Sequence, residues 1–331
     1  MTKKIPFSEA FKDKTSRNPK VPKKSYQEFG DIPVIDQGKE FIAGFTSADN
    51  QMASTRLPVI LFGDHTKTVK YVDQPFALGA DGVKVLEPQP GFIPKYLYWA
   101  LKDTCLPDAG YSRHFKFLKE SSFAKPSIDE QLKIVQMRDL QQLIENKRER
   151  QQELFNEFKY SVFNKMFKSL EPNYTLEEAC IKITDGTHQS PKWEDSGIPF
   201  LFVSNITSGE INFETKKFIS EETLRNLTRN TAIEKGDILY STVGSYGIPA
   251  LVRTDQKFAF QRHIAHIKPN HSIVIPEFLA FQLSTENIRQ TAKTKVKGVA
   301  QPTLNLKDLK EFNVIIPKIS EQKKFLEMII H

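Results

Sequence analysis

Apolar residues follow two different patterns along the chain, and each pattern predicts a different kind of element. Short runs rich in Val, Ile, Leu and Phe occupy 57–63, 236–244 and 263–269 and stand next to Gly, Asp or Pro, which is typical of β-strands. Residues 127–170 contain neither Gly nor Pro, and their apolar residues recur mostly three or four positions apart. That spacing favours a single helix of about 40 residues, roughly 60 Å long. The pattern therefore predicts a strand-rich lobe on either side of a long helix.

The ends of the predicted helices carry their own signals. Ser127 precedes the long helix and Glu130 follows three residues later, which is the pattern of a capping box. Two shorter helices are predicted at 94–102 and 276–284, because each begins with a Pro that follows Ile, and Pro is favoured at the first helical position. A last helix is expected over 320–331, where it makes barely three turns.

Two stretches of the chain repeat each other. Residues 71–101 align without a gap on residues 253–283, at a constant offset of 182. The matched pairs are Asp73-Gln74 with Asp255-Gln256, Phe76-Ala77 with Phe258-Ala259, Ile93-Pro94 with Ile275-Pro276, and Leu101 with Leu283. Farther on, at an offset of 191, a Pro-x-x-x-Glu-Gln motif recurs as Pro126 with Pro317 and Glu130-Gln131 with Glu321-Gln322. Several matches in the same order indicate an internal duplication.

The duplication predicts an α+β protein of two similar lobes, each a mixed or antiparallel sheet with a few helices. The Pro-x-x-x-Glu-Gln motif then marks the point where each lobe passes into a helix. The predicted division is a first lobe at 1–126, a long helix at 127–170, a second lobe at 171–319 and the beginning of a second long helix at 320–331.

Composition and charge narrow the class of protein. With 39% hydrophobic and 26% charged residues, the chain of 331 residues is expected to be soluble, globular and multidomain. A net charge of +7 favours a polyanionic partner such as nucleic acid, although a basic protein without such a partner stays an open alternative. No run of about 18 apolar residues predicts a membrane span. The segment MTKKIPFSEAFKDK lacks the apolar region of a secretory signal, and Cys105 and Cys180 form no disulfide or metal pattern, so a cytoplasmic location is expected.

The motifs of the most relevant enzyme classes are missing from the sequence. We find no glycine-rich methyltransferase loop with an Asn/Asp-Pro-Pro-aromatic motif, no Gly-x-x-x-x-Gly-Lys-Ser/Thr loop of an ATP-driven motor, and no Gly-x-Ser-x-Gly elbow of a hydrolase. The single Pro-Asp, Pro107-Asp108, lies about a hundred residues from Glu214-Thr-Lys216, too far for a typical nuclease motif. Ser-His-Asp catalysis stays open, as does a hydrolase built on the turn from Asp185 to His188.

The second half of the chain contains the motifs KITDGTHQSP, GIPFLFVSNI, KGDILYSTVGSYGIPALV, QRHIAHIKP and QPTLNLKDLKEFNVIIPKISEQKKF. With these motifs, and with its order of lobe, long helix, lobe and helix, the whole chain resembles a specificity subunit of a type I restriction-modification system. The resemblance implies that each lobe is a target recognition domain that reads one half of a bipartite DNA site. It also implies that two long helices pair antiparallel, fix the spacing between the half-sites and dock two modification subunits.

Further expectations follow from the resemblance. The chain would be a non-catalytic subunit that binds double-stranded DNA and contacts restriction subunits through the modification subunits. It would hold no metal or cofactor itself, whereas the full endonuclease and adenine methyltransferase complex would use S-adenosylmethionine, ATP and Mg²⁺. Two departures from the family pattern are the short helix at 320–331 and a first lobe that matches less closely. An alternative is therefore a self-associating or scaffold protein with altered specificity.

Candidate DNA contacts are polar and basic side chains in predicted loops, because phosphate contacts set affinity and base-edge contacts set specificity. The candidates in the second lobe are Thr187, His188, Gln189, Ser190, Lys192, Ser245, Tyr246, Arg262, Lys293, Lys295 and Lys297. Those in the first lobe are His65, Lys67, Lys70, Tyr111, Arg113, His114 and Lys116. Arg113 is the best candidate for a base contact, because Arg paired with guanine is the commonest specific contact in the major groove.

Each candidate group has a structural alternative. The turn from Asp185 to His188 has the look of a metal site, and the glycines beside Ser245 can serve only a hairpin turn. The lysines of KTKVKG, at alternate positions or in a loop, can form a solvated face, and Arg262 can belong to an ion pair.

Overall fold

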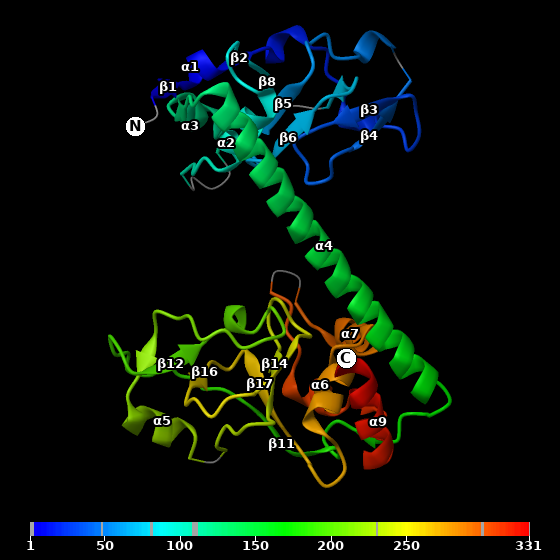
Figure 1. Cartoon of the computed structure of the whole chain (residues 1–331). Coiled ribbons are helices and arrows are strands. Elements are labelled where there is room, and N and C mark those ends of the chain that lie inside the picture. The colour runs from blue at the N-terminus through cyan, green and yellow to red at the C-terminus, as the bar shows by residue number, and fades with distance from the viewer. Residues whose placement is uncertain are drawn as a thin grey trace. The chain divides into compact units, whose positions relative to one another are not determined.

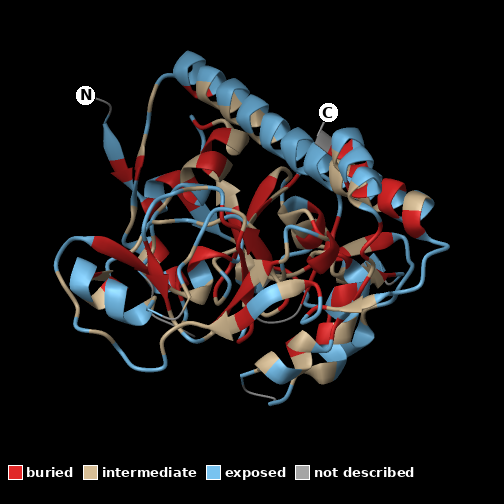
Figure 2. Ribbon diagram, turned by 90° about the horizontal axis from the view of Figure 1, so that it is seen from below, coloured by how far each residue is buried: buried red, intermediate tan, exposed pale blue. Residues whose placement is uncertain are grey.

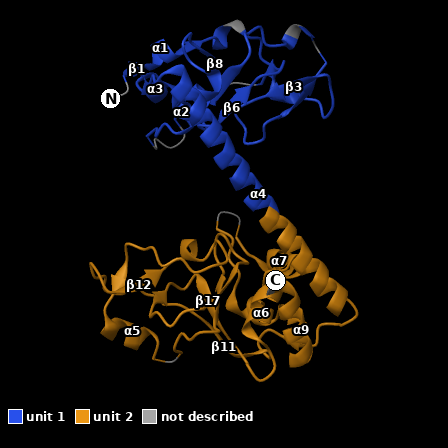
Figure 3. Ribbon diagram, in the orientation of Figure 1, with its two compact units in different colours: residues 1–150 blue, residues 151–331 orange. Residues whose placement is uncertain are grey.

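A computed structural model describes residues 3–47, 49–79, 82–107, 112–229, 231–298 and 301–330. The chain forms two compact units, unit 1 over Met1–Arg150 and unit 2 over Gln151–His331 (Figure 3). The boundary between the units falls inside the long helix α4 (Ile128–Phe167), so each unit contains one part of it. None of the helices in the described ranges is long and apolar enough to cross a membrane.

Unit 1 contains three sheets and a small set of helices (Figure 1). A four-stranded antiparallel sheet has the order β2 (Phe11–Asp13), β8 (Val83–Pro88), β5 (Val59–Gly63) and β6 (Val69–Val72). A three-stranded sheet has the order β4 (Gly44–Thr46), β3 (Ile32–Ile35) and β7 (Ala77–Leu78), and β1 (Lys4–Pro6) pairs with β9 (Ser122–Ala124). The helices are α1 (Phe7–Ala10), α2 (Pro94–Lys102), α3 (Phe115–Lys119) and the N-terminal part of α4.

Unit 2 repeats this arrangement. Its four-stranded antiparallel sheet has the order β11 (Cys180–Asp185), β17 (Ile264–Pro269), β14 (Ile238–Ser241) and β15 (Pro249–Leu251). Its three-stranded sheet has the order β13 (Phe218–Ile219), β12 (Ile198–Leu201) and β16 (Ala259–Phe260), and β10 (Tyr174–Thr175) pairs with β18 (Asn313–Val314). The helices are α5 (Glu221–Leu227), α6 (Pro276–Leu283), α7 (Glu286–Lys295), α8 (Leu306–Lys310) and α9 (Ile319–Ile330).

The two units share one topology, which confirms the predicted duplication. In each three-stranded sheet the central strand pairs antiparallel with the next strand and parallel with the third. In each unit the helix that begins with Ile-Pro follows the long strand of the four-stranded sheet, and the first and last strands pair with each other. The predicted α+β class, the mixed and antiparallel pairing and the long helix are therefore present.

Aromatic side chains form the contact between α4 and the rest of unit 2. Five phenylalanines from three helices pack with ring centroids 4.9–6.0 Å apart, and they are Phe163 and Phe167 of α4, Phe278 and Phe281 of α6, and Phe325 of α9. Tyr160 of α4 also donates a hydrogen bond to the Ser284 carbonyl at 3.0 Å. Because such rings bury large apolar areas, this cluster fixes the C-terminal end of α4 to unit 2.

The Pro-x-x-x-Glu-Gln motif has a structural explanation. Gln131 of α4 is fully buried, and its Oε1 accepts a hydrogen bond from the Ile93 N–H at 2.8 Å. Its Nε2 donates to the carbonyls of Gly91 and Pro126 at 3.2 and 3.0 Å. The side-chain amide thus ties the start of one helix to the loop that precedes the Ile-Pro helix. We call this arrangement the glutamine lock.

The same lock occurs in unit 2. Gln322 of α9 is also fully buried, its Oε1 accepts from the Ile275 N–H at 2.8 Å, and its Nε2 donates to the carbonyls of Ile273 and Pro317. The acidic residue of the motif has a separate task, because Glu130 accepts a hydrogen bond from the N–H of Ser127 and Glu321 accepts one from the N–H of Lys318. Ser127 and Glu130 form the predicted capping box.

Removal of the lock is expected to destabilise the unit that contains it. Gln322→Leu leaves the Ile275 N–H and two carbonyls buried without partners, at a cost of about 1–3 kcal/mol for each unsatisfied group. We expect a clear loss of stability in urea unfolding. Gln151→Leu, at an exposed position of α4, is the control and should change stability little. Equal stability of the two variants would contradict a structural role for the lock.

Much of α4 is exposed to solvent and packs on no other described element of the unit to which it belongs. Figure 2 shows a long exposed stretch of this helix. Its apolar side chains at 42–57% exposure are Ile128, Leu132, Met137, Leu140, Leu143, Ile144, Leu154 and Phe158. Most of these residues lie three or four positions apart, the spacing from which the sequence predicts the long helix.

Candidate nucleic-acid interface

Four segments of unit 2 meet at one end of its four-stranded sheet. The turn after β11 joins the β16–β17 connection, because the Arg262 N–H donates to the Thr187 carbonyl at 3.0 Å. That connection joins the β14–β15 turn through the Thr242 N–H and the His263 carbonyl, 3.0 Å apart. The β14–β15 turn joins the segment after α7 through Gly244 N–H and the Pro302 carbonyl, also at 3.0 Å. We call residues 185–190, 242–247, 261–263 and 301–304 with Lys297 the turn cluster of unit 2.

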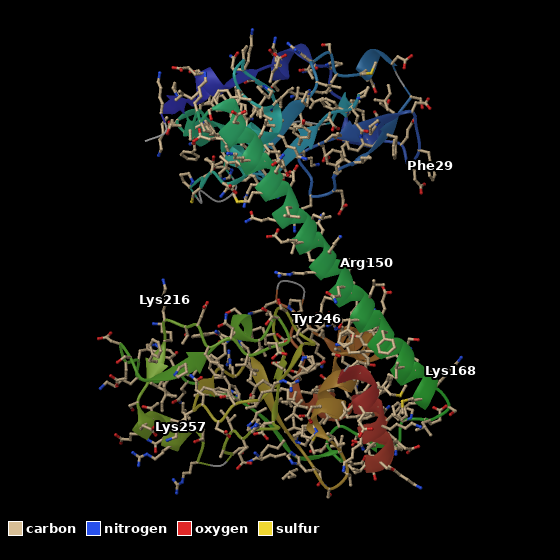
Figure 4. All side chains as sticks on the ribbon, in the orientation of Figure 1. Phe29, Arg150, Lys168, Lys216, Tyr246 and Lys257 are labelled. Atoms are coloured by element: carbon tan, nitrogen blue, oxygen red, sulfur yellow. The ribbon has the colours of Figure 1, made fainter. Side chains whose placement is uncertain are left out.

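The turn cluster of unit 2 brings together many of the predicted DNA contacts. Exposed side chains in it are His188, Gln189, Ser190, Ser245, Arg262 and Lys297. Thr187 and Tyr246 are half-buried, and Tyr246 packs on the main core of the unit (Figure 4). Lys192 is exposed just beyond the first segment. Residues up to 110 positions apart in the sequence thus share one surface. Whether they touch DNA stays a prediction.

Two kinds of glycine shape the turn cluster of unit 2. A Cβ atom at Gly186 would lie 2.2 Å from the Phe260 carbonyl oxygen, so only glycine permits this close approach to the backbone. Its role is therefore the close approach to a neighbouring strand. Gly244 and Gly247 have φ of +71° and +85°, so both glycines serve the hairpin turn, which is the structural role that the sequence analysis considered for them.

The polar side chains of the Asp185–His188 turn bond one another. His188 Nε2 lies 2.8 Å from Asp185 Oδ2, and Thr187 Oγ1 donates to the Gln189 carbonyl. Among the residues that the structure describes, no group of three or more His, Cys, Asp or Glu is placed to hold a metal ion. The pairing therefore shapes the turn and leaves Gln189 and Ser190 exposed.

The lysines after α6 lie differently from the prediction. Lys293 and Lys295 are in the last turn of helix α7, and neither a strand nor a loop contains them. Lys295 Nζ lies 3.0 Å from Glu311 Oε2, which makes it part of an ion pair. Lys297 follows the helix and pairs with Thr303 through backbone hydrogen bonds. Of the three, Lys293 and Lys297 are exposed.

Arg262 has no carboxylate partner within the described ranges, so the predicted ion-pair alternative is not found there. Its Nε donates to His263 Nε2 at 3.4 Å. Partial burial and then the neighbouring Arg262 charge lower the pKa of His263, so this imidazole is neutral near pH 7 and its nitrogen can accept the hydrogen bond. The Arg262 side chain therefore offers an exposed positive charge in the turn cluster.

Unit 1 has an equivalent surface. The Asp64 N–H donates to the Gly82 carbonyl, and the His114 N–H donates to the Asp64 carbonyl at 2.8 Å. The turn after β2 joins β8 through the Lys14 N–H and the Val85 carbonyl, also at 2.8 Å. We call residues 13–18, 63–68, 82–83 and 112–116 the turn cluster of unit 1. It contains the predicted residues His65, Lys67, Arg113, His114 and Lys116.

Two predicted contacts of unit 1 do not fit a surface role. Lys70 is 5% exposed, and its ammonium donates to the backbone carbonyls of Asp36, Glu40 and Phe41. Burial lowers the pKa of Lys70, and the nearby carboxylates only partly oppose this shift. His114 is 1% exposed, and its Nδ1 lies 3.1 Å from the Asp64 carbonyl. His114 supports the turn cluster from inside, whereas Lys70 holds the segment 36–41, so we remove both from the candidate contacts.

The other predicted residues of unit 1 differ in exposure. Arg113 and Lys116 are exposed, and Lys116 Nζ lies 4.7 Å from the centre of the Phe117 ring. His65 and Lys67 are half-buried, and Lys67 has φ of +59°, the left-handed conformation of a tight turn. Tyr111 lies outside the described residues.

One segment of the interface was missed by the sequence analysis. DKTSRNPK at 13–20 and DGTHQSPK at 185–192 share Asp, Thr, Pro and Lys at the same four positions, at an offset of 172. Both octapeptides begin at the end of equivalent strands, β2 and β11. A search for repeats at a third offset would have found this pair. Ser16 and Lys20 of the first octapeptide, both with exposed side chains, therefore join the candidate contacts.

A buried charge network links β14 and β17 in the four-stranded sheet of unit 2. Asp237 and His266 are 4% and 2% exposed, and the Asp237 Oδ2 to His266 Nε2 distance is 2.7 Å. Lys268 Nζ lies 3.0 Å from the same carboxylate and 2.8 Å from Glu234. Burial alone would raise the pKa of Asp237, but hydrogen bonds from His266, the Glu234 N–H and Lys268 together lower it. The carboxylate is therefore ionised and holds β14 and β17 in place.

The fold, the duplication and the repeated turn clusters define a class of protein with two equivalent units joined by a helix. Known proteins of this class are similar to the chain. Residues 173–329 match the family described as Type I restriction modification DNA specificity domain. The type I restriction enzyme EcoBI specificity subunit of Escherichia coli is 35% identical over 133 residues, which are 40% of this chain and 28% of that subunit. The chain thus spans less than a third of that relative in the matched region.

Two further comparisons cover more of the chain. The EcoR124I/EcoR124II specificity subunit of Escherichia coli is 22% identical over 98% of this chain and 85% of its own length. The crystal structure of the S subunit from M. genitalium matches with a TM-score of 0.56 and 18% identity, over 100% of this chain and 88% of that one, and shows the same fold. Together these comparisons indicate a type I restriction-modification specificity subunit, and the family match itself covers residues 173–329.

Proposed function

We propose that the chain reads a bipartite site in double-stranded DNA, with the turn cluster of each unit as its contact surface. The observation that carries the proposal is the equivalence of the two clusters. The same four kinds of segment meet at the same end of each four-stranded sheet, whereas their exposed side chains differ. A shared frame with different polar surfaces suits two half-sites of different sequence.

Charge and chemistry support this assignment. The exposed side chains of the two clusters include Arg113, Lys116, Arg262 and Lys297 as cations and Gln189, Ser190 and Ser245 as neutral donors and acceptors. Cations suit phosphate oxygens, and Arg and Gln suit base edges in the major groove. A scaffold without DNA specificity would not require this combination at equivalent places of both units.

In this proposal, the chain supplies specificity to other subunits and does no chemistry itself. The exposed apolar face of α4 is the surface on which modification subunits, two per chain, would dock, and restriction subunits would join through them. S-adenosylmethionine, ATP and Mg²⁺ would act in those subunits. Self-association through α4 is the alternative occupant of the same face. Mass by light scattering, alone and with modification subunits, distinguishes the two assemblies.

The DNA contacts can be tested by affinity and its salt dependence. The preferred duplex would first be selected from random sequences. Lys297→Ala is expected to weaken binding of all duplexes alike and to reduce the slope of log K against log salt by about 0.9, the value for one phosphate contact. Arg113→Ala is expected to cost about 1–3 kcal/mol for the preferred duplex and to relax specificity at one position.

Lys216→Ala is the matched control, because Lys216 is exposed in unit 2 but lies away from Tyr246 and the turn cluster (Figure 4). Its loss should leave the salt slope unchanged. An identical slope for Lys297→Ala and Lys216→Ala would count against the turn cluster of unit 2 as the contact surface. A chain that binds random duplexes as tightly as selected ones would overturn the proposal.

A further inference from the structure

A cavity of about 400 Å³ opens beside the turn cluster of unit 2. It lies between the end of β11, the segment after α5, and strands β16 and β17. Its size is within the range of about 300–1,000 Å³ that is usual for small-molecule sites. The Asp185–His188 turn lines the cavity and belongs to the turn cluster, so the cavity opens next to the proposed DNA contacts.

The apolar part of the lining can accept the flat face of an aromatic ligand. It consists of Leu227, Ile233, Ala259 and Phe260. The Phe260 ring is held edge-on against His266, with ring centroids 5.9 Å apart and an interplanar angle of 85°. Leu227 is 38% exposed and offers apolar surface to a base, whereas Phe260 is 5% exposed and contributes little of that surface. Burial of apolar surface contributes about 25 cal/mol per Å².

The polar part of the lining offers hydrogen bonds of both kinds. Four threonines and an amide contribute, and they are Thr184, Thr187, Thr228, Thr231 and Asn226. Thr187 Oγ1 and Thr228 Oγ1 already donate to the carbonyls of Gln189 and Leu224, so these two hydroxyls can accept from a base. The amide of Asn226 can both donate and accept, which suits the edge of a heterocyclic base. Lys182 also lines the cavity, and the His188 imidazole is paired with the carboxylate of Asp185.

His266 gives this wall a fixed orientation. Its Nε2 faces the ionised Asp237, which can only accept, so Nε2 carries the proton and donates to the carboxylate. Asp237 is itself held by Lys268 and the Glu234 N–H. The imidazole that lines the cavity therefore cannot turn freely, which is the rigidity that a binding site requires.

We propose that this cavity binds a single purine or pyrimidine base that is unstacked from the DNA strand at the turn cluster. The source of the base rests on the proposed DNA-reading function, whereas the fit of the base depends only on the cavity. Extrusion of one base costs a few kcal/mol, which packing on the apolar wall and hydrogen bonds to Thr184 and Asn226 would offset. A filled cavity would thus add a contact that duplex binding alone does not supply.

The fit is tested with 2-aminopurine deoxyriboside, whose fluorescence anisotropy reports binding to the full chain. Saturable binding is expected for the native protein. Thr184→Val, an isosteric change in β11, is expected to weaken binding about fivefold, the effect of one lost hydrogen bond. Thr228→Trp is expected to abolish binding, because the indole fills the cavity. Deoxyribose 5-phosphate, which has no base, should not compete.

Thr294→Trp, on an exposed turn of α7 outside the cavity, is the control for Thr228→Trp and should bind like the native chain. Thermal unfolding confirms that each variant is folded. Absence of saturable binding to the native chain, competition by deoxyribose 5-phosphate, or native affinity in both cavity variants would each overturn the inference.

The source of the base is tested with an oligonucleotide that contains one 2-aminopurine. A rise in its emission on binding, absent in Thr228→Trp, is expected for a base that leaves the stack. If the free nucleoside binds but the oligonucleotide shows no such rise, the cavity binds free nucleosides, and the proposal that the base comes from the DNA strand is wrong. Duplex affinity is measured on the same samples. Normal duplex binding without nucleoside binding would reject only the cavity inference, whereas nucleoside binding without any duplex preference would reject only the proposed function.

Discussion

Replacement of Phe325 by alanine is expected to lower the free energy of unfolding of unit 2 by about 3–5 kcal/mol, the usual cost of an aromatic-to-alanine change in a core. Phe325 is fully buried and contacts Phe163, Phe167, Phe278 and Phe281 at once. Its loss leaves a cavity between three helices, which cannot all move inwards together. Urea unfolding followed by circular dichroism measures the change.

The same substitution tests how α4 is held. Because the phenylalanine cluster is the main aromatic contact between α4 and unit 2, Phe325→Ala should also raise amide hydrogen exchange at the C-terminal end of α4. Met328→Ala is the control on the same helix, since Met328 is 46% exposed, and it should change stability by less than about 0.5 kcal/mol. Similar stability losses in the two variants would show that the cluster does not anchor α4.

Removal of the Asp237 carboxylate is the second large effect that we expect. Asp237→Ala leaves His266 and Lys268 without their shared buried partner, and breaking such a pair from one side costs about 3–5 kcal/mol. Glu234→Gln is the control, because Glu234 contacts the same Lys268 but is largely exposed, so its effect should be small. Thermal unfolding at pH 7 compares the two variants.

The Asp237 network also predicts a direction for the pH dependence of stability. The pKa of Asp237 is lower in the folded chain than its ordinary value of 3.8. Its contribution is therefore fully present above that ordinary value and is lost as the pH falls through the lower, folded pKa. The native chain should thus lose part of its stability below about pH 4, and Asp237→Ala should lack that part. Parallel pH profiles for the two proteins would contradict an ionised Asp237.

The elements that the sequence predicts correctly are those with local signals. The Ile-Pro helices, the capping box of Ser127 and Glu130 and the long helix all depend on residues close together in the chain. The duplication was visible because two offsets preserve the order of its matches. The boundary of the compact units, inside α4, carries no local signal, because both of its sides are continuous helix.

The candidate site could be predicted only as separate segments. The sequence indicates polar loops, but hydrogen bonds such as Arg262 to Thr187 and Gly244 to Pro302 decide which loops meet. Lys70 and His114 show the main failure, since a basic residue in a polar loop can point inwards and bond buried carbonyls. Lys293 and Lys295 show another, because their alternate spacing indicated a strand or a loop, whereas both lie in the last turn of the helix α7.

The glutamine lock has a consequence for how such chains can change over generations. In both units the side-chain amide of the buried glutamine makes three equivalent hydrogen bonds, which connect the helix that contains it to the segments around the Ile-Pro helix. Recombination between the gene segments that encode the two locks would therefore preserve these hydrogen bonds, although the turn clusters of the two units differ. Such an exchange would give an intact fold with a new pair of half-sites, so new targets could arise by shuffling whole units without redesign of their cores.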